Sequence, residues 1–206
     1  MRYINFLKRC LRFLKNQICD IRYCGGFLGV TVKTKYKNMG ANDSGYTDYG
    51  VIKYIFDCVK VNQDDVLVDI GCGKGRVIGW WLKNGYRNNK IVGIELDSDI
   101  ANDAVKRFKK YSNVSIINGD AIENIPIDAT YFYLFNPFNR DIMIKFKQKL
   151  FDTFYKKKNI KIIYHNCCYL DLFQNDEHWE VKLLDMNETK KWHETAIITF
   201  KNSQIY

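Results

Sequence analysis

A glycine-rich segment with the sequence DIGCGKGR occupies residues 69–76, at the end of a short apolar run. Glycines at alternate positions let the backbone turn tightly and approach a ligand closely. If a helix follows, its first N–H groups and the positive end of its dipole point toward the same place. Arg76 stands where a dinucleotide-binding fingerprint has its third glycine, and the spacing of a Walker A loop is absent. The segment therefore predicts a ligand-binding turn, and other residues have to identify the ligand.

Polar residues also end or follow the next three apolar runs. Glu95 ends the second run, where a carboxylate can accept hydrogen bonds from both hydroxyls of a ribose. Asp120 follows the third run and can accept a hydrogen bond from the exocyclic amine of a base. Asn136-Pro137-Phe138 follows the fourth run and holds one of only two prolines in the chain. If the runs are parallel strands, these residues all face one crevice at the carboxyl edge of the sheet.

In this order, the motifs resemble those of class I S-adenosylmethionine-dependent methyltransferases, over about residues 46–201. The resemblance implies that Asp69 and the glycine segment hold the methionine part of S-adenosylmethionine, while Glu95 binds the ribose. It also implies that Leu96 lies against the adenine and that Asp120 and Ala121 recognise its edge. Aromatic residues just before the first motif line the cofactor mouth in similar proteins, which here indicates Tyr46 and Tyr49. The expected cofactor-binding residues are Tyr49, Asp69, Gly71, Cys72, Gly73, Gly75, Glu95, Leu96, Asp120, Ala121 and Asn136.

The residues after the fourth and fifth runs are the candidates for catalysis. Methyltransferases acting on amino groups often carry two prolines and an aromatic residue after an Asn or Asp there, and the amide positions the amine. This chain has Asn136-Pro137-Phe138, one proline short, so methylation of oxygen and of nitrogen both stay open. An oxygen acceptor also needs its proton removed. His165 is the candidate base, with a hydrogen-bonded structural histidine as the alternative. The expected catalytic residues are thus Asn136, Pro137, Phe138 and His165.

The elements that must position these residues alternate regularly along the chain. Apolar runs predict five buried parallel strands, and helical spacing separates them. Two further runs, at 179–184 and 195–201, have no helix-length insert between them and predict an antiparallel pair. The pattern predicts an α/β fold with a doubly wound, mostly parallel seven-stranded sheet and a C-terminal antiparallel strand pair. We also expect a strand at 27–36 and Ser98 as the N-cap of the helix that follows the second strand.

Composition excludes several classes of protein. With 206 residues, 47% of them hydrophobic, the chain is not intrinsically disordered. No apolar run approaches the length of a membrane-spanning helix. The seven cysteines include no C-x-x-C pair, so we expect no zinc site or other metal. Cysteines used in this way are typical of a reducing compartment, so a cytoplasmic protein is expected.

The net charge of +9 lies almost entirely in the first fifth of the chain. Residues 1–40 hold nine basic side chains and one acidic side chain, whereas residues 41–206 hold 23 and 22. Residues 1–23 combine helical spacing of apolar residues with a basic face, which predicts an amphipathic helix. Three interpretations stay open. In the first, the apolar stripe of this helix packs on the domain. In the second, the helix adsorbs to an anionic membrane surface, at the inner face of the membrane. In the third, residues 1–22 deliver RNA or another anionic substrate.

These observations predict a basic N-terminal helix and connector at 1–45 and an S-adenosylmethionine-binding methyltransferase domain at 46–206. The compact chain favours a small-molecule or saccharide methyl acceptor. One alternative is a methyltransferase of a macromolecule, either RNA or a protein amine, docked by the basic N-terminal arm. A second alternative is a non-catalytic module that binds the cofactor or a membrane.

Overall fold

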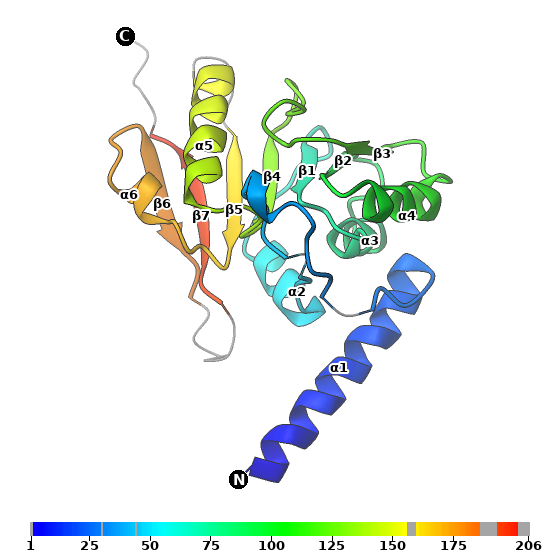
Figure 1. Ribbon diagram of the computed structural model, residues 1–206. Coiled ribbons are helices and arrows are strands. Elements are labelled where there is room, and N and C mark those ends of the chain that lie inside the picture. The colour runs from blue at the N-terminus through cyan, green and yellow to red at the C-terminus, as the bar shows by residue number, and fades with distance from the viewer. Residues whose placement is uncertain (1, 30, 44, 156–159, 186–192, 202–206) are drawn as a thin grey trace.

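The computed structural model describes residues 2–29, 31–43, 45–155, 160–185 and 193–201 (Figure 1). The helices are α1 (Arg2–Cys24), α2 (Tyr49–Asp57), α3 (Arg76–Lys83), α4 (Ser98–Phe108), α5 (Arg140–Phe154) and α6 (Asp171–Gln174), with a 3-10 turn, η1 (Lys37–Met39), before α2. The strands are β1 (Val66–Ile70), β2 (Lys90–Glu95), β3 (Val114–Asn118), β4 (Tyr131–Phe135), β5 (Lys161–His165), β6 (Trp179–Leu183) and β7 (Thr195–Phe200).

In the described part of the chain, the strands form one seven-stranded sheet in the order β3-β2-β1-β4-β5-β7-β6. Strands β1 to β5 pair in parallel, and β7 runs antiparallel to both β5 and β6. The predicted fold, with its C-terminal antiparallel pair and its N-terminal helix, is confirmed. The strand order reverses between β1 and β4, and the carboxyl ends of these two strands are where such sheets bind ligands.

Helices cover both faces of the sheet (Figure 1). On one face, α5 packs through Phe146, Leu150 and Phe154, beside Phe173 of α6. On the other face, α2, α3 and α4 bury their apolar sides. The central strand β1 is buried at all five of its positions, which explains why its sequence is almost uniformly apolar. The one exception, Asp69, is therefore a carboxylate inside the sheet.

Side chains cap three of the helices near the crevice. Asp48 accepts a hydrogen bond from the N–H of Gly50 and begins α2, and Asn139 accepts the N–H of Ile142 and begins α5. The expectation for α4 was wrong by one residue. Asp97, rather than Ser98, has the extended backbone of an N-cap, and its carboxylate accepts from two N–H groups of the first turn.

The strand expected at 27–36 is also wrong, since the described residues of this segment lie outside the sheet. Carboxylate side chains bind its backbone instead of a neighbouring strand. The N–H of Leu28 donates to Asp20, and the N–H of Thr34 donates to Asp43. These side chains supply the hydrogen bonds that a strand would otherwise obtain from a sheet.

Helix α1 packs on α3 through its polar side. Asn16 and Asp20 are buried there, whereas Leu11 and Ile18 are 57% and 66% exposed. The interpretation that the apolar stripe packs on the domain is therefore wrong. The reason is that the domain offers polar partners to this helix, and buried polar groups need such partners.

A buried ion pair connects α1 to the start of α3. The Nη2 atom of Arg76 lies 2.6 Å from Oδ2 of Asp20, and the two side chains are 4% and 0% exposed. The hydroxyl of Tyr49 donates to the other oxygen of Asp20 at 2.8 Å. The guanidinium carbon of Arg76 lies 3.8 Å from the centroid of the Tyr46 ring. We term these four residues the α1 junction.

Replacing Asp20 tests the α1 junction. Asp20→Ala leaves Arg76 buried without its carboxylate, so the free energy of unfolding should fall by about 3–5 kcal/mol. Urea unfolding followed by far-ultraviolet circular dichroism measures this change. Asp57→Ala is the matched control, because it breaks an exposed ion pair with Lys53 and should leave the midpoint nearly unchanged. Equal midpoints for both variants would show that the junction does not support the fold.

Candidate functional site

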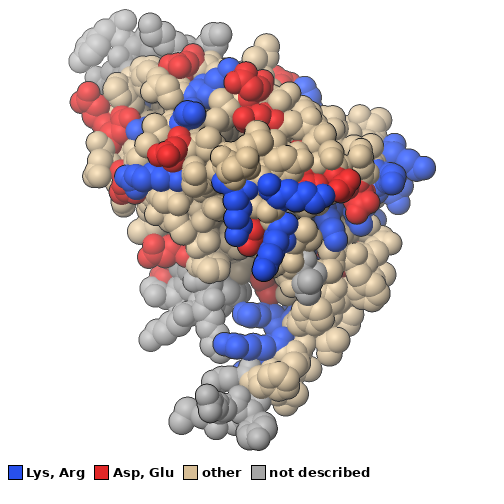
Figure 2. Space-filling view, in the orientation of Figure 1, with Lys and Arg blue, Asp and Glu red and all other residues tan. Residues whose placement is uncertain are grey.

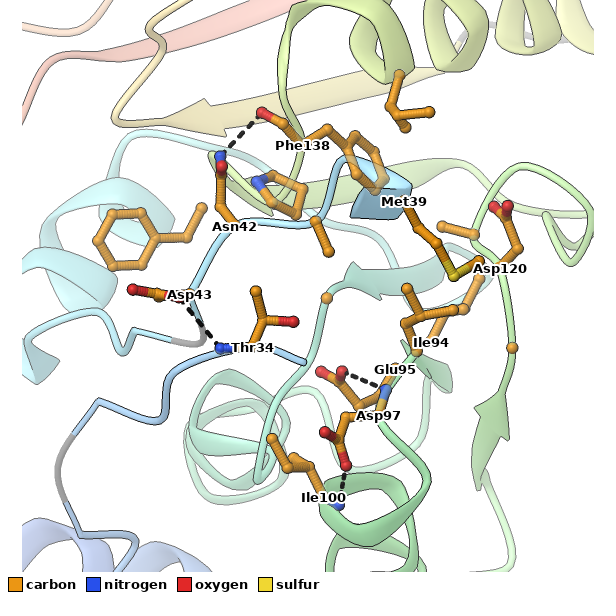
Figure 3. Close-up of a pocket in the computed structure, with 18 of the residues that line it drawn as sticks. Thr34, Met39, Asn42, Asp43, Ile94, Glu95, Asp97, Ile100, Asp120 and Phe138 are labelled. Carbon is orange, nitrogen blue, oxygen red and sulfur yellow. Dashed lines mark hydrogen bonds between the residues drawn. The ribbon is translucent and has the colours of Figure 1, made fainter. Parts of the chain in front are cut away.

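The carboxyl ends of β1 to β4 surround a cavity that we term the strand-end cavity (Figure 3). It spans about 870 Å³, including the part open to solvent, which is in the size range of small-ligand sites. In Figure 3, Glu95, Asp97 and Ile100 lie on one side of it, and Met39 and Phe138 lie on the opposite side. Its wall thus combines acidic groups with apolar surface.

Glu95 holds the glycine segment against the end of β2. Its Oε2 accepts the N–H of Gly73 at 2.8 Å, and its Oε1 accepts the N–H of Asp97 at 3.0 Å. Burial raises the pKa of Glu95, while these backbone hydrogen bonds oppose the rise. A carboxylate oxygen has two lone pairs, so each oxygen keeps one for a donor inside the strand-end cavity.

A second cavity, the loop cavity, lies beside the glycine segment and is lined by Asp69, Cys72, Lys74 and Tyr46, among others. Like the strand-end cavity it is lined by Gly71, so the two cavities adjoin. Together they follow the edge of the sheet from β1 to β3.

Asp69 is buried in the wall of the loop cavity, and its carboxylate accepts no hydrogen bond from any described residue. Burial, and then the nearby charge of Glu95, raise the pKa of Asp69 to about 8. A buried carboxylate without a donor is costly for the protein. The cavity beside it therefore suits a ligand group that carries positive charge and N–H donors.

Gly75 turns the chain from the glycine segment into α3. Its backbone is left-handed, with φ +84°, and a Cβ at this position would lie 2.3 Å from Cε2 of Phe108 in α4. Both the backbone and the space therefore require glycine. This close packing fixes the start of α3 beside the two cavities.

Residues 37–43, which we term the strap, cross the rim opposite the glycine segment. The side-chain amide of Asn42 donates to the carbonyl oxygens of Asn136 and Phe138 at 2.8 and 2.9 Å. The backbone N–H of Asn42 donates to the carbonyl of Pro137 at 2.9 Å. The strap and the motif after β4 thus form one continuous wall (Figure 3).

The side chain of Asn136, which follows β4, is bonded to Tyr164 of β5. Asn136 has a left-handed backbone, with φ +41°, and its Oδ1 accepts the hydroxyl of Tyr164 at 3.0 Å. It lines none of the cavities described for this site. The amide oxygen that would position an amine therefore already holds a donor.

A third cavity, the α1 cavity, lies between α1 and the carboxyl ends of β4 and β5. It spans about 700 Å³, including the part open to solvent, and Arg9 and Arg12 line it from α1. It shares Tyr46, Thr47 and Phe135 with the loop cavity, so the two cavities adjoin. A group in the loop cavity and a second molecule in the α1 cavity would meet at these shared residues.

His165 lines the α1 cavity from the end of β5. Its Nδ1 lies 2.8 Å from the hydroxyl oxygen of Thr195, and its ring packs on Phe135. Burial, followed by the neighbouring His193, lowers the pKa of His165 to about 4. The ring is therefore neutral at pH 7, and one of its two nitrogens carries no proton.

Most of the residues expected from the sequence line one of the three cavities. These are Asp69, Gly71, Cys72, Glu95, Leu96, Asp120, Ala121, Pro137, Phe138 and His165. Gly73, Gly75, Asn136 and Tyr49 do not. Tyr49 belongs to the α1 junction, where burial and the bond to Asp20 hold it, and Tyr46 lines the loop cavity in its place.

The sequence pattern did not indicate the strap or the α1 junction. Met39 and Asn42 reach the strand-end cavity from a connector whose composition resembles that of any polar loop. Arg76 offered a partial signal, because a long cation in place of a glycine needs an anionic or aromatic partner. No sequence pattern near Arg76 identified Asp20 as that partner, because the two residues are 56 positions apart.

Two absences concern the described residues alone. They contain no group of three or more His, Cys, Asp or Glu side chains arranged to hold a metal ion. None of their helices is long and apolar enough to span a bilayer.

Part of this chain is similar in sequence to known proteins. Residues 67–157 match the family model described as a methyltransferase domain. A protein-lysine N-methyltransferase of Saccharolobus islandicus (strain REY15A) is 31% identical over 98 residues, which are 46% of this chain and 60% of that protein. Ribosomal RNA small subunit methyltransferase A of Persephonella marina (strain DSM 14350 / EX-H1) is 39% identical over 72 residues, 34% of this chain and 26% of that protein. The chain thus spans less than two thirds of either relative.

Solved structures share the fold over about three quarters of this chain. An RNA methyltransferase from Salinibacter ruber in complex with S-adenosyl-L-homocysteine superposes with a TM-score of 0.59 at 21% identity, covering 78% of this chain and 96% of that one. A putative O-methyltransferase from Klebsiella pneumoniae gives 0.60 at 11% identity, covering 76% and 82%. With the sheet order and the glycine segment, these likenesses show that the chain has the fold of class I S-adenosylmethionine-dependent methyltransferases, and its residues 67–157 match a methyltransferase domain.

Proposed function

We propose that this chain transfers a methyl group from S-adenosylmethionine to a small-molecule or saccharide acceptor. The observation that carries the proposal is the buried carboxylate of Asp69, which lines the loop cavity and has no donor among the described residues. The methionine part of the cofactor offers an ammonium group, which is the cationic donor that this carboxylate lacks. The residues present therefore fit the cofactor at its methionine end.

The strand-end cavity fits the nucleoside end. Glu95 keeps a lone pair on each carboxylate oxygen, which suits the two ribose hydroxyls. Asp120 uses Oδ1 for the N–H of Ile122 at 2.8 Å, and its side chain lies at the cavity wall in Figure 3. Its second oxygen is the proposed acceptor for the adenine amine, beside Ala121. The apolar side chains of Met39 and Ile100 are placed to contact the ring.

The acceptor is proposed to occupy the α1 cavity. The cofactor supplies a methyl group that is already activated on a sulfonium, so the chain contributes alignment and exclusion of water. Tyr46, Thr47 and Phe135 separate the loop cavity from the α1 cavity and are the residues beside which the two substrates would meet. We propose that neutral His165 accepts the proton of a hydroxyl acceptor.

Two observations favour a small acceptor with a hydroxyl group. The α1 cavity is covered by α1 and has the size of a small-molecule site. In addition, Asn136 lines none of the three cavities, so its amide oxygen does not face the proposed place of the acceptor. Positioning of an amine by Asn136 would require its side chain to turn toward the α1 cavity.

A macromolecular acceptor is the second candidate. Curated relatives include proteins named for methylation of ribosomal RNA and of protein lysine. Arg9 and Arg12 line the α1 cavity and are exposed, so they could contact a phosphate backbone. The two candidates differ in which fraction of a cell extract would receive the methyl group.

Calorimetry with S-adenosylhomocysteine tests the cofactor site. The wild-type protein should bind it, and Glu95→Gln should weaken binding by about tenfold or more, because the paired ribose bonds are lost. Asp69→Asn should also weaken binding, since the amide has no negative charge for the ammonium group. Glu180→Gln on the exposed side of β6 is the matched control and should bind like wild type. Absence of binding by the wild-type protein would overturn the proposed function.

The raised pKa of Asp69 also predicts that the stability of the protein depends on pH. This pKa is about 8 in the folded chain and 3.8 as the ordinary value, so the folded state binds more protons than the unfolded state between these limits. Stability from this residue is therefore present below about pH 4 and is lost as the pH rises toward 8, with a slope of at most about 1.4 kcal/mol per unit. Urea unfolding should show Asp69→Asn gaining on wild type as the pH rises from about 5 to about 8. A constant difference would contradict a raised pKa.

A labelled methyl group distinguishes the acceptors. Incubation of a cell extract with the protein and methyl-labelled cofactor should place the label in the small-molecule fraction. Label in RNA or protein would favour the second candidate. His165→Asn should lower the incorporation at least tenfold while leaving the affinity for S-adenosylhomocysteine unchanged. Full incorporation by His165→Asn would exclude the histidine as the base.

A further inference from the structure

The outward side of α1 carries a continuous stripe of exposed apolar side chains. The apolar stripe consists of Leu7, Leu11, Leu14, Ile18 and Ile21, each at least 48% exposed. The alternating spacing of four and three residues keeps them on one line along the helix. Phe6 and Phe27 are also exposed, at 67% and 66%. Single exposed apolar residues are ordinary, but an aligned set on one helix indicates a surface that becomes covered.

Basic residues border the apolar stripe. Lys8, Lys15 and Arg22 recur every seven residues, so they lie on one line that runs beside the stripe. The only acidic residue of α1 is Asp20, which is buried against Arg76 on the other side of the helix. In Figure 2 the lower end of the molecule, where α1 lies, shows tan surface along its outer side and blue atoms toward the body of the domain. The exposed surface of α1 is thus apolar and cationic.

A second copy of α1 does not complement this surface. In a parallel pair of such helices, Lys15 and Arg22 would face positions equivalent to Cys10 and Gln17, neither of which is acidic. In an antiparallel pair, the basic line of one helix would face the basic line of the other. Coiled-coil pairing would therefore bury the apolar stripe at the cost of unpaired or repelling cations.

RNA explains the cations but not the apolar stripe. Phosphate contacts use basic side chains and polar groups, and they leave large aliphatic side chains in water. An anionic lipid surface accommodates both features, because the aliphatic side chains enter the boundary between headgroups and acyl chains while the cations contact the headgroups. The polar side of α1, which carries Asn16 and Asp20, stays bonded to the domain.

We propose that α1 docks this chain on an anionic membrane surface through the apolar stripe and through Lys8, Lys15 and Arg22. Docking needs no rearrangement of the domain, because the stripe already faces solvent. It also places the α1 cavity, which Arg9 and Arg12 line from the same helix, beside the bilayer surface. The inference does not depend on methyl transfer and is tested without it.

Sedimentation with lipid vesicles tests the proposal. The full chain should sediment with vesicles of phosphatidylcholine and phosphatidylglycerol and stay largely unbound with phosphatidylcholine alone. Leu11→Glu combined with Ile18→Glu should abolish the binding. Reversal of charge at Lys8, Lys15 and Arg22 should lower the partition coefficient by at least roughly 100-fold, because loss of each cation near the surface costs about fivefold and the new anions add repulsion. Raising the salt concentration should weaken the binding of wild type.

A matched variant reverses the charge of Lys83, Lys109 and Lys145, which are exposed outside α1, and should bind vesicles like wild type. The variants in α1 alter exposed side chains, so their urea midpoints should match wild type. Equal binding to both vesicle compositions, or equal loss in the matched variant, would overturn the proposal. So would a wild-type dimer in solution that Leu11→Glu dissociates, since a second copy would then cover the stripe.

Discussion

The ion pair between Asp20 and Arg76 is the interaction on which the arrangement of this molecule depends. Both charges are almost completely buried, so each requires the other, and a helix near the start of the chain is thereby held against the first turn of α3. Arg76 follows the glycine segment directly and also lies on the ring of Tyr46. One buried cation therefore connects α1, the glycine segment and the wall shared by the loop cavity and the α1 cavity.

This pair also explains why α1 is oriented as it is. An amphipathic helix usually turns its apolar side to the core, because burial of apolar surface is favourable. Here the side facing the domain carries Asp20 and Asn16, whose partners are Arg76 and Asp48. Leaving the buried guanidinium of Arg76 without its carboxylate would cost about 3–5 kcal/mol, which opposes turning the apolar side of α1 inward. The apolar stripe is left in water as a result.

The sheet and the strand-end residues could be predicted because their signals are local. An apolar run that ends in Glu95, or in Asp69 and glycines, specifies a strand and the group at its end at once. The α1 junction could not be predicted, since Asp20 and Arg76 are 56 residues apart and no periodicity connects them. The strap was missed for a similar reason. Asn42 donates to the carbonyl oxygens of Asn136 and Phe138. Every residue type has a backbone carbonyl, so the sequence does not indicate which one accepts.

The contact between Gly75 and Phe108 restricts how this sequence can diverge. Any side chain at position 75 would have to adopt a left-handed backbone and displace a buried aromatic ring from α4. A smaller residue at position 108 removes only the second obstacle and leaves a cavity in the core. No single-step exchange at either site keeps both the turn and the packing, so descendants of this chain should retain the two residues as a pair. Their joint presence is thus a more discriminating marker of this particular turn than the glycines alone.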